Sequence, residues 1–132
     1  MLPYRNESAF SAALCKLLTN KGIFHQRIES GLTGCGIPDL YIRLSSKEIW
    51  VELKNDKIIS IKAKLWLINW RKGQQSWMLN YKKVSNRYGY TVVACKDGFL
   101  VIPMNKRYVK NIVHSDEVFS MTSIKDILGV LC

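Results

Sequence analysis

The strongest constraint on the fold is a pair of strand-like runs, residues 37–44 and 47–54, separated only by two serines. Apolar and polar residues alternate in both runs. The apolar residues on one face are Leu40, Ile42 and Leu44 in the first run and Ile49, Val51 and Leu53 in the second. A period of two predicts strands with one buried face, and the short connection predicts an antiparallel hairpin.

The hairpin brings two acidic residues face to face. If Leu44 pairs with Lys47, Asp39 lies directly opposite Glu52 on the same face, and a four-residue loop gives the same register. Cross-strand Cβ atoms are then about 5 Å apart, where like charges destabilise a sheet. Lys54 shares this face. A hard divalent cation such as Mg²⁺ would offset the repulsion, because it prefers carboxylate and carbonyl oxygens. Simple hydration of a solvent-facing side is the alternative.

Two further polar residues are predicted to converge on these carboxylates. Glu7 follows the helix-capping residue Asn6 and shares a helical stripe with the apolar Phe10, so it should point inward. Alternatively, it is a first-turn carboxylate favoured by the helix dipole. Gln74 begins a second stripe that continues to Trp77. A buried amide needs hydrogen-bond partners, which a carboxylate site would supply, although a helix-start residue half in water is the alternative.

The remaining elements follow from periodicity and turn residues. We expect helices at 7–20, 72–88 and 122–131, strands at 23–28, 90–94 and 99–102, and a loop at 29–36. The stripe of the middle helix is formed by Trp77, Tyr81, Val84 and Tyr88. The stretch 56–71 fits a helix and a strand equally well.

Positive charge is concentrated in one segment. The chain has a formal net charge of +10, and residues 57–110 contain twelve basic residues and one acidic residue. Such a patch attracts polyanions, above all nucleic acid, whereas a solvated basic face is the alternative. The aromatic residues of this segment fit either base stacking or a core. The candidate nucleic-acid-binding residues are Lys57, Lys62, Lys64, Arg71, Lys72, Lys82, Lys83 and Arg87.

Length and composition narrow the class of protein. The 132 residues suit one domain, and a hydrophobic content of 48% is ordinary for a globular chain. No apolar run is long enough to span a membrane, and the N-terminal residues do not resemble a secretory signal. The four scattered cysteines are Cys15, Cys35, Cys95 and Cys132. They predict reduced thiols in a cytoplasmic protein rather than a disulfide framework or zinc site.

Four motifs in order resemble one known family. Glu7, then GIPDL (36–40), VELK (51–54) and QQSW (74–77) resemble the PD-(D/E)xK nuclease superfamily, and more narrowly its VRR-NUC (virus-type replication-repair nuclease) branch. The resemblance covers residues 7–102. It implies an α/β fold with a restriction-endonuclease-like core, a mixed central sheet flanked by helices (αβββαβ).

The resemblance also implies a domain plan. Residues 1–132 would form a single nuclease domain, with its core at 7–102, a basic insert at 56–71 and a C-terminal extension at 103–132. The link between Lys54 and Gln74 is longer than in the family members. The insert within it would be a DNA-binding flap or a dimer contact.

Site roles follow position by position from the family. Asp39, Glu52 and the backbone carbonyl of Leu53 would bind Mg²⁺ or Mn²⁺, and Glu7 would support the metal or its water. Lys54 would orient or deprotonate the attacking water.

The family's glutamine falls on Gln74, which would hold Lys54 or the substrate in place. The adjacent Gln75 is a weaker candidate, because three-residue spacing to Trp77 favours Gln74. The five predicted catalytic residues are therefore Glu7, Asp39, Glu52, Lys54 and Gln74.

The function implied is that of a divalent-metal-dependent, structure-specific DNA endonuclease that cleaves branched DNA such as Holliday junctions. The protein would act in DNA recombination and repair as a homodimer with no membrane partner. It would act in the cytoplasm, which is the host cytoplasm if it is a viral protein. The alternatives are a general or restriction-like endonuclease without branch preference, and a non-catalytic nucleic-acid-binding module.

Overall fold

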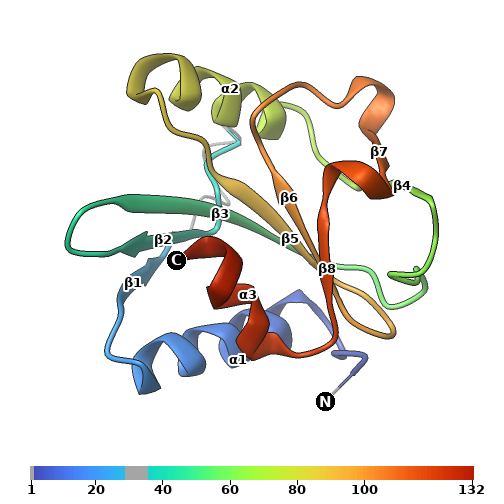
Figure 1. Ribbon diagram of the computed structural model, residues 1–132, viewed down its shortest axis with the longest axis horizontal. Helices are drawn as coiled ribbons and strands as arrows, with labels where there is room; N and C mark the ends of the chain where they lie inside the picture. The colour runs from blue at the N-terminus through green and yellow to red at the C-terminus, as the bar shows by residue number, and fades with distance from the viewer. Residues whose placement is uncertain (1, 29–35) are drawn as a thin grey trace.

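A mixed β-sheet lies at the centre of the molecule, with helices on both faces (Figure 1). The computed structural model describes residues 2–28 and 36–132. The helices are α1 (Glu7–Asn20), α2 (Gln74–Ser85) and α3 (Ile124–Leu131). The strands are β1 (Phe24–Arg27), β2 (Leu40–Arg43), β3 (Glu48–Asn55), β4 (Leu65–Leu67), β5 (Tyr90–Ala94), β6 (Phe99–Pro103), β7 (Ile112–His114) and β8 (Phe119–Met121). Short 3₁₀ turns cover Val109–Asn111 and Ser115–Glu117.

Six of these strands form the central sheet, in the order β1-β2-β3-β5-β6-β8. Strands β3 and β5 are parallel, and the other neighbours are antiparallel. In the β2–β3 hairpin Leu40 pairs with Val51, and the Leu44 amide donates to the Lys47 carbonyl at 2.8 Å. The predicted hairpin and its register are therefore confirmed.

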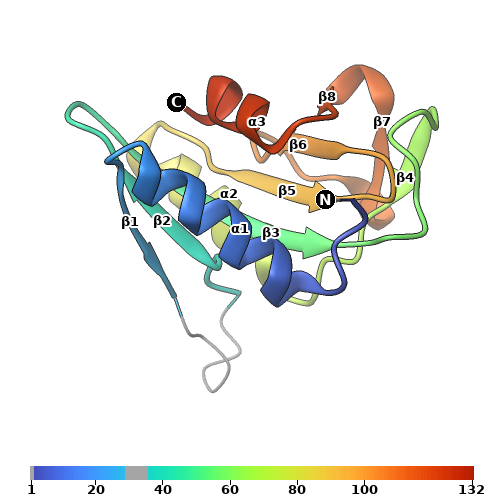
Figure 2. The ribbon, with the colours of Figure 1, turned by 90° about the horizontal axis from the view of Figure 1, so that it is seen from below.

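Helix α1 covers one face of the sheet because its apolar stripe is continuous. Asn6 caps it by accepting from the Ala9 amide at 2.8 Å. Phe10, Leu14 and Leu18 are fully buried. They pack against the sheet on the same side as α3, as Figure 2 shows from below. The predicted start and buried stripe of this helix are confirmed.

Helix α2 covers the opposite face, but its buried stripe differs from the prediction. Met78 and Gln75 are its buried residues, whereas Val84 is 88% exposed and Tyr88 lies beyond the helix. The stripe through Val84 and Tyr88 was therefore wrong. The buried arc centres on Gln75 and Met78, and the helix ends at Ser85, so residues of the last turn face solvent.

The stretch 56–71 contains a short strand, which resolves the ambiguity of its pattern. Strand β4 pairs antiparallel with β7 of the C-terminal extension, with Trp66 opposite Val113. Trp66 and Trp70 are buried in a second hydrophobic cluster on the α2 side of the sheet. Their indole N–H groups donate to the Ser60 carbonyl (2.8 Å) and the Thr91 hydroxyl (3.0 Å). These two tryptophans are core residues and do not offer a surface to bases.

The C-terminal extension also completes the first cluster. Strand β8 adds to the sheet beside β6, and α3, capped by Ser123, buries Ile127 and Leu131 against the same face as α1. The predicted final helix is confirmed. None of the helices in the described ranges is long and apolar enough to cross a membrane.

The structure describes the state of three of the four cysteines. Cys15, Cys95 and Cys132 are free thiols, as predicted. Cys35 and the loop predicted at 29–36 fall, except for Gly36, outside the described residues.

We expect the C-terminal extension to contribute directly to stability. Replacing the fully buried Ile127 by Ala leaves a cavity in the first cluster and should lower the free energy of unfolding by about 2–4 kcal/mol. Urea denaturation measures this change. The exposed neighbour Lys125 provides the control, since Lys125→Ala should shift the free energy by less than about 0.5 kcal/mol. Equal effects of the two variants would contradict a core role for α3.

Candidate active site

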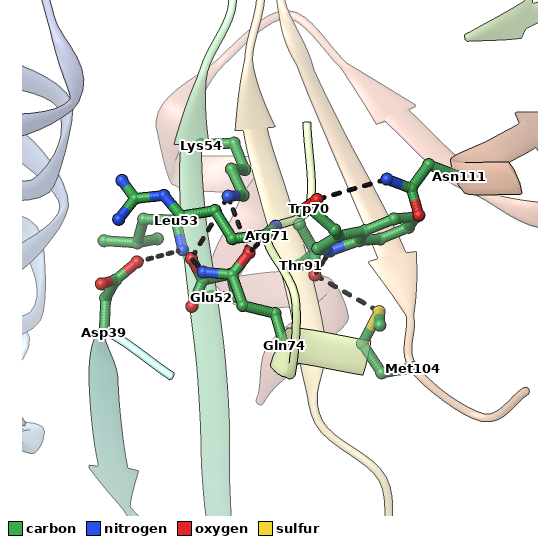
Figure 3. A network of polar contacts seen from close by, with 10 residues as sticks. All are labelled: Asp39, Glu52, Leu53, Lys54, Trp70, Arg71, Gln74, Thr91, Met104 and Asn111. Atoms are coloured by element: carbon green, nitrogen blue, oxygen red, sulfur yellow. Dashed lines mark hydrogen bonds and ion pairs between the residues drawn. The ribbon is translucent and has the colours of Figure 1, made fainter. Parts of the chain in front are cut away.

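Two carboxyl groups face each other at the end of the β2–β3 hairpin (Figure 3). Asp39 immediately precedes β2, and Glu52 lies on β3 with only 4% of its surface exposed. Burial raises the pKa of Glu52 to about 8, with the Asp39 charge as the next contribution. The Glu52 Oε1 atom is buried and has no hydrogen-bond partner. A buried acceptor beside a like charge is costly in a metal-free protein.

The backbone of Leu53 joins these two carboxyl groups. Its amide donates to Asp39 Oδ2 at 2.9 Å. Strand β2 begins at Leu40, opposite Val51, and within residues 2–28 and 36–132 no strand pairs with β3 beyond Val51 on this side. The N–H and C=O of one strand residue point toward the same neighbour, and the Leu53 carbonyl therefore leaves β3 on the Asp39 side.

These donors suit a hard divalent cation. Two carboxylates and one carbonyl supply the oxygen ligands that Mg²⁺ and Mn²⁺ prefer, with water completing the coordination. The unpartnered Glu52 Oε1 fits this role, because a cation would satisfy it. In residues 2–28 and 36–132 no group of three or more His, Cys, Asp or Glu is arranged to hold a metal. Glu7 therefore does not complete a three-carboxylate ligand set.

Lys54 and Gln74 form a compact polar network beside Glu52. The Lys54 Nζ atom donates to Gln74 Oε1 at 2.9 Å and lies 3.7 Å from Glu52 Oε2. Gln74 Nε2 donates to Glu52 Oε2 at 2.8 Å. The Arg71 backbone amide donates to the same Gln74 oxygen at 2.8 Å. Gln74 thus fixes the positions of both the lysine and the carboxylate.

Gln75 lies elsewhere. Its side chain is buried, accepts from the Tyr108 amide at 2.7 Å and donates to the Tyr108 carbonyl and to Asn111. It anchors the C-terminal extension to α2. The three-residue spacing to Trp77 favoured Gln74 over Gln75, and Gln74 is the glutamine that contacts Lys54.

The electrostatics of Lys54 differ from the expectation based on charge alone. Neighbouring carboxylates favour its charged form, but burial dominates and holds the pKa of Lys54 below its ordinary value. The Glu52 and Glu7 charges oppose this effect, and Arg71 adds to it. A lysine in this environment releases its proton more readily than an exposed one.

Glu7 faces the site from α1 while remaining open to solvent. It lines a cavity of about 440 Å³ together with Lys54, and a smaller one of about 110 Å³ together with Asp39. Burial, followed by the Asp39 charge, raises the pKa of Glu7. Glu7 lines both cavities as an exposed residue of the first turn of α1, so the prediction that it points inward rather than into solvent is not confirmed.

Arg27 is a charged neighbour that the sequence patterns did not single out. It lies at the end of β1 and lines the smaller cavity with Glu7 and Asp39. In the sequence, Arg27 is marked only by its position one residue before the end of the strand-like run 23–28, which gives no indication that it lies near the carboxylates. Arg71, a predicted nucleic-acid contact, lines the larger cavity. All eight predicted nucleic-acid-binding residues are exposed.

Gly36 brings the loop before Asp39 against the start of α2. Its φ is +76°, and a Cβ atom there would overlap the Gly73 carbonyl and come within 2.8 Å of the Gln74 amide. The absence of a side chain at Gly36 therefore lets two site-bearing segments touch.

We expect the metal-free site to weaken the fold as pH rises. Glu52 has a higher pKa folded than unfolded, so its contribution is fully favourable below about pH 4.3 and is lost as pH rises toward 8. Glu52→Gln removes the buried charge and still offers Gln74 an acceptor. In EDTA at pH 8.5 the variant should be roughly 2–4 kcal/mol more stable than wild type, and nearly equal at pH 4.5. Urea denaturation at both pH values measures this. A wild type that gains stability from pH 4.5 to 8.5 relative to the variant would contradict it.

Gly36→Ala should destabilise the protein more than the same change at Gly22. Both glycines have positive φ, so both variants incur about 1 kcal/mol of backbone strain. Only Gly36 has backbone within contact distance of the added methyl group, whereas Gly22 has no atom within 4 Å. We expect a further loss of about 1–3 kcal/mol for Gly36→Ala in urea denaturation. Equal losses would show that the loop does not press on α2.

The comparisons with known proteins support the fold. The structure is similar to Hjc of Archaeoglobus fulgidus, a Holliday junction resolvase from an archaeal hyperthermophile, with a TM-score of 0.63 and 14% identity. The similarity covers 93% of this chain and 98% of that chain. No family model matches the chain, and no curated protein is significantly similar to it. The α/β, restriction-endonuclease-like fold class predicted from the sequence is confirmed, and VRR-NUC membership stays a prediction.

Proposed function

We propose that this protein is a divalent-metal-dependent DNA endonuclease of the PD-(D/E)xK type that cleaves branched DNA such as Holliday junctions. The observation that carries the proposal is the juxtaposition of Asp39, Glu52, Lys54 and Gln74 at the open edge of β3. A buried carboxylate that faces a second carboxylate has no structural benefit. Their arrangement is explained by a cation and a phosphodiester substrate.

In this proposal Asp39, Glu52 and the Leu53 carbonyl hold Mg²⁺ or Mn²⁺, which when bound lowers the pKa of water and neutralises charge on the scissile phosphate. Glu7, which completes no side-chain ligand set, holds a water of the ion. It faces the site across the cavity that it shares with Lys54.

Lys54 orients the attacking water and stabilises the charge that develops on the phosphate. Burial, which lowers its pKa, favours the neutral amine, the form that can accept a proton from water. Gln74 is a positioning residue: its oxygen holds the lysine and its amide nitrogen holds Glu52, so both keep their places as charge changes. The products would carry 5′-phosphate and 3′-hydroxyl ends, by analogy with the superfamily.

The preference for branched DNA is supported by the similarity of the fold to a Holliday junction resolvase. A four-way junction is pseudo-symmetric and requires two strands to be cut. A homodimer with one active site per strand would match that symmetry. The net charge of +10 would attract the phosphate backbone.

Cleavage of matched substrates tests the proposal. The wild type should cut a four-way junction in Mg²⁺ or Mn²⁺ but not in EDTA, and should cut a linear duplex of the same sequence more slowly. Asp39→Asn and Glu52→Gln should each lower the cleavage rate at least about a hundredfold while DNA binding persists. Asp126→Asn, at an exposed carboxylate on α3, is the control and should leave the rate unchanged.

Other outcomes would replace the proposal by its alternatives. Equal rates on the junction and on the duplex would indicate a general or restriction-like endonuclease. Binding without cutting in any divalent metal would indicate a non-catalytic nucleic-acid-binding module.

A further inference from the structure

The larger cavity beside the candidate active site is built largely by the insert. It measures about 440 Å³, within the range of pockets that hold one small organic molecule. Lys54 and Glu7 lie at its active-site end. The insert and the residues leading into it supply most of the remaining lining, with Asn69 and Arg71 among the polar groups. The apolar members of the lining are Ile59, Ile68 and Val93.

Two cations face this one space. Arg71 is exposed and lines the cavity together with Lys54, and the acidic residues Glu7 and Asp56 line it as well. Figure 3 shows Lys54 and Arg71 on the same side of the sheet. A phosphate suits a guanidinium and an ammonium, because it accepts charge-assisted hydrogen bonds from both. The cavity is therefore suited to a phosphate at its Lys54 end.

The rest of the lining suits the remainder of a nucleotide. Amide groups at Asn55 and Asn69 offer hydrogen bonds, and the apolar side chains Ile59 and Ile68 offer contact to the face of a base. A paired and stacked base presents neither its face nor its hydrogen-bonding edge to a protein cavity. A cavity of this kind, which is open to solvent at Asn69 and Arg71, admits the face of a base only after the base has left the stack.

We infer that the 440 Å³ cavity holds one unstacked nucleotide of the cleaved DNA strand, next to the scissile phosphate, with Arg71 binding its phosphate. This inference rests on the proposed function and deepens it. Unstacking costs least where pairing is already interrupted. The protein would then prefer branched DNA because a nucleotide at the branch point unstacks easily. This preference requires no recognition of the base sequence.

A matched charge pair provides the first test. Arg71→Gln should weaken junction binding and raise KM about tenfold, and should lower the slope of log affinity against log salt by about one. Lys16→Gln removes the same charge from an exposed residue of α1 that does not line the cavity. It should change KM by less than about threefold. Equal effects of the two variants would overturn the role of Arg71.

Filling the cavity without changing charge provides the second test. Asn69→Trp places an indole at the exposed cavity wall and should lower junction cleavage at least tenfold, while stabilisation of the protein by Mn²⁺ is retained. Asn20→Trp, at the exposed far end of α1, is the matched control and should cleave normally. Normal cleavage by Asn69→Trp would show that the cavity is not used.

A fluorescent base reports the nucleotide directly. A junction with 2-aminopurine next to the mapped cleavage position should brighten when it binds wild-type protein in EDTA, because an unstacked base is less quenched. It should stay dim with Asn69→Trp. No brightening with the wild type, in a junction that the enzyme cleaves in Mg²⁺, would overturn the inference and leave the proposed function intact. Failure of the wild type to cleave any DNA in Mg²⁺ or Mn²⁺ would instead overturn the proposed function.

Discussion

The repulsion between Asp39 and Glu52 is the constraint around which the site is arranged. The hairpin register forces the two carboxyl groups together, and burial deprives Glu52 of the water that would screen it. Three protein groups partly offset the cost: the Leu53 amide on Asp39, and Gln74 and Lys54 on Glu52. Among the described residues, one oxygen of Glu52 is left without a hydrogen-bond partner. The protein contacts of this carboxylate are therefore incomplete.

The sequence predicted the parts of this site that depend on local geometry. Alternation with a period of two, together with a two-serine turn, determines which residues face each other, so Asp39 and Glu52 could be paired without coordinates. Helical spacing likewise distinguished Gln74, which contacts Lys54, from Gln75, which contacts Tyr108. These inferences succeed because each depends on neighbours within one hairpin or one helix.

Features that depend on distant partners could not be predicted. The pairing of β4 with β7 joins residues nearly fifty positions apart, and nothing in the ambiguous pattern of 56–71 specifies that partner. The contact of Gly36 with Gly73 joins residues 37 positions apart. The lowered pKa of Lys54 also depends on remote packing: the charges near it can be counted along the hairpin, whereas its burial depends on how α2 and the insert cover the strand.

Hydrogen bonds connect the insert and the C-terminal extension to the site. The Asn111 side chain, in the turn before β7, donates to the Trp70 carbonyl at 3.3 Å. Arg71, which follows Trp70 in the chain, donates its backbone amide to the Gln74 side chain. Lys110 and Asn111 both have left-handed backbones (φ 57° and 61°), which is costly for a lysine. Gln75 and Trp70 hold this turn from two sides. A strained backbone conformation persists only where the surrounding contacts hold it. Here the contacts that hold the turn come from Trp70 and Gln75, the neighbours in sequence of Arg71 and Gln74. The tryptophans of the long link between Lys54 and Gln74 anchor it in the second cluster, and its polar residues line the cavity. The link is therefore better described as a folded wall of the site than as a flap.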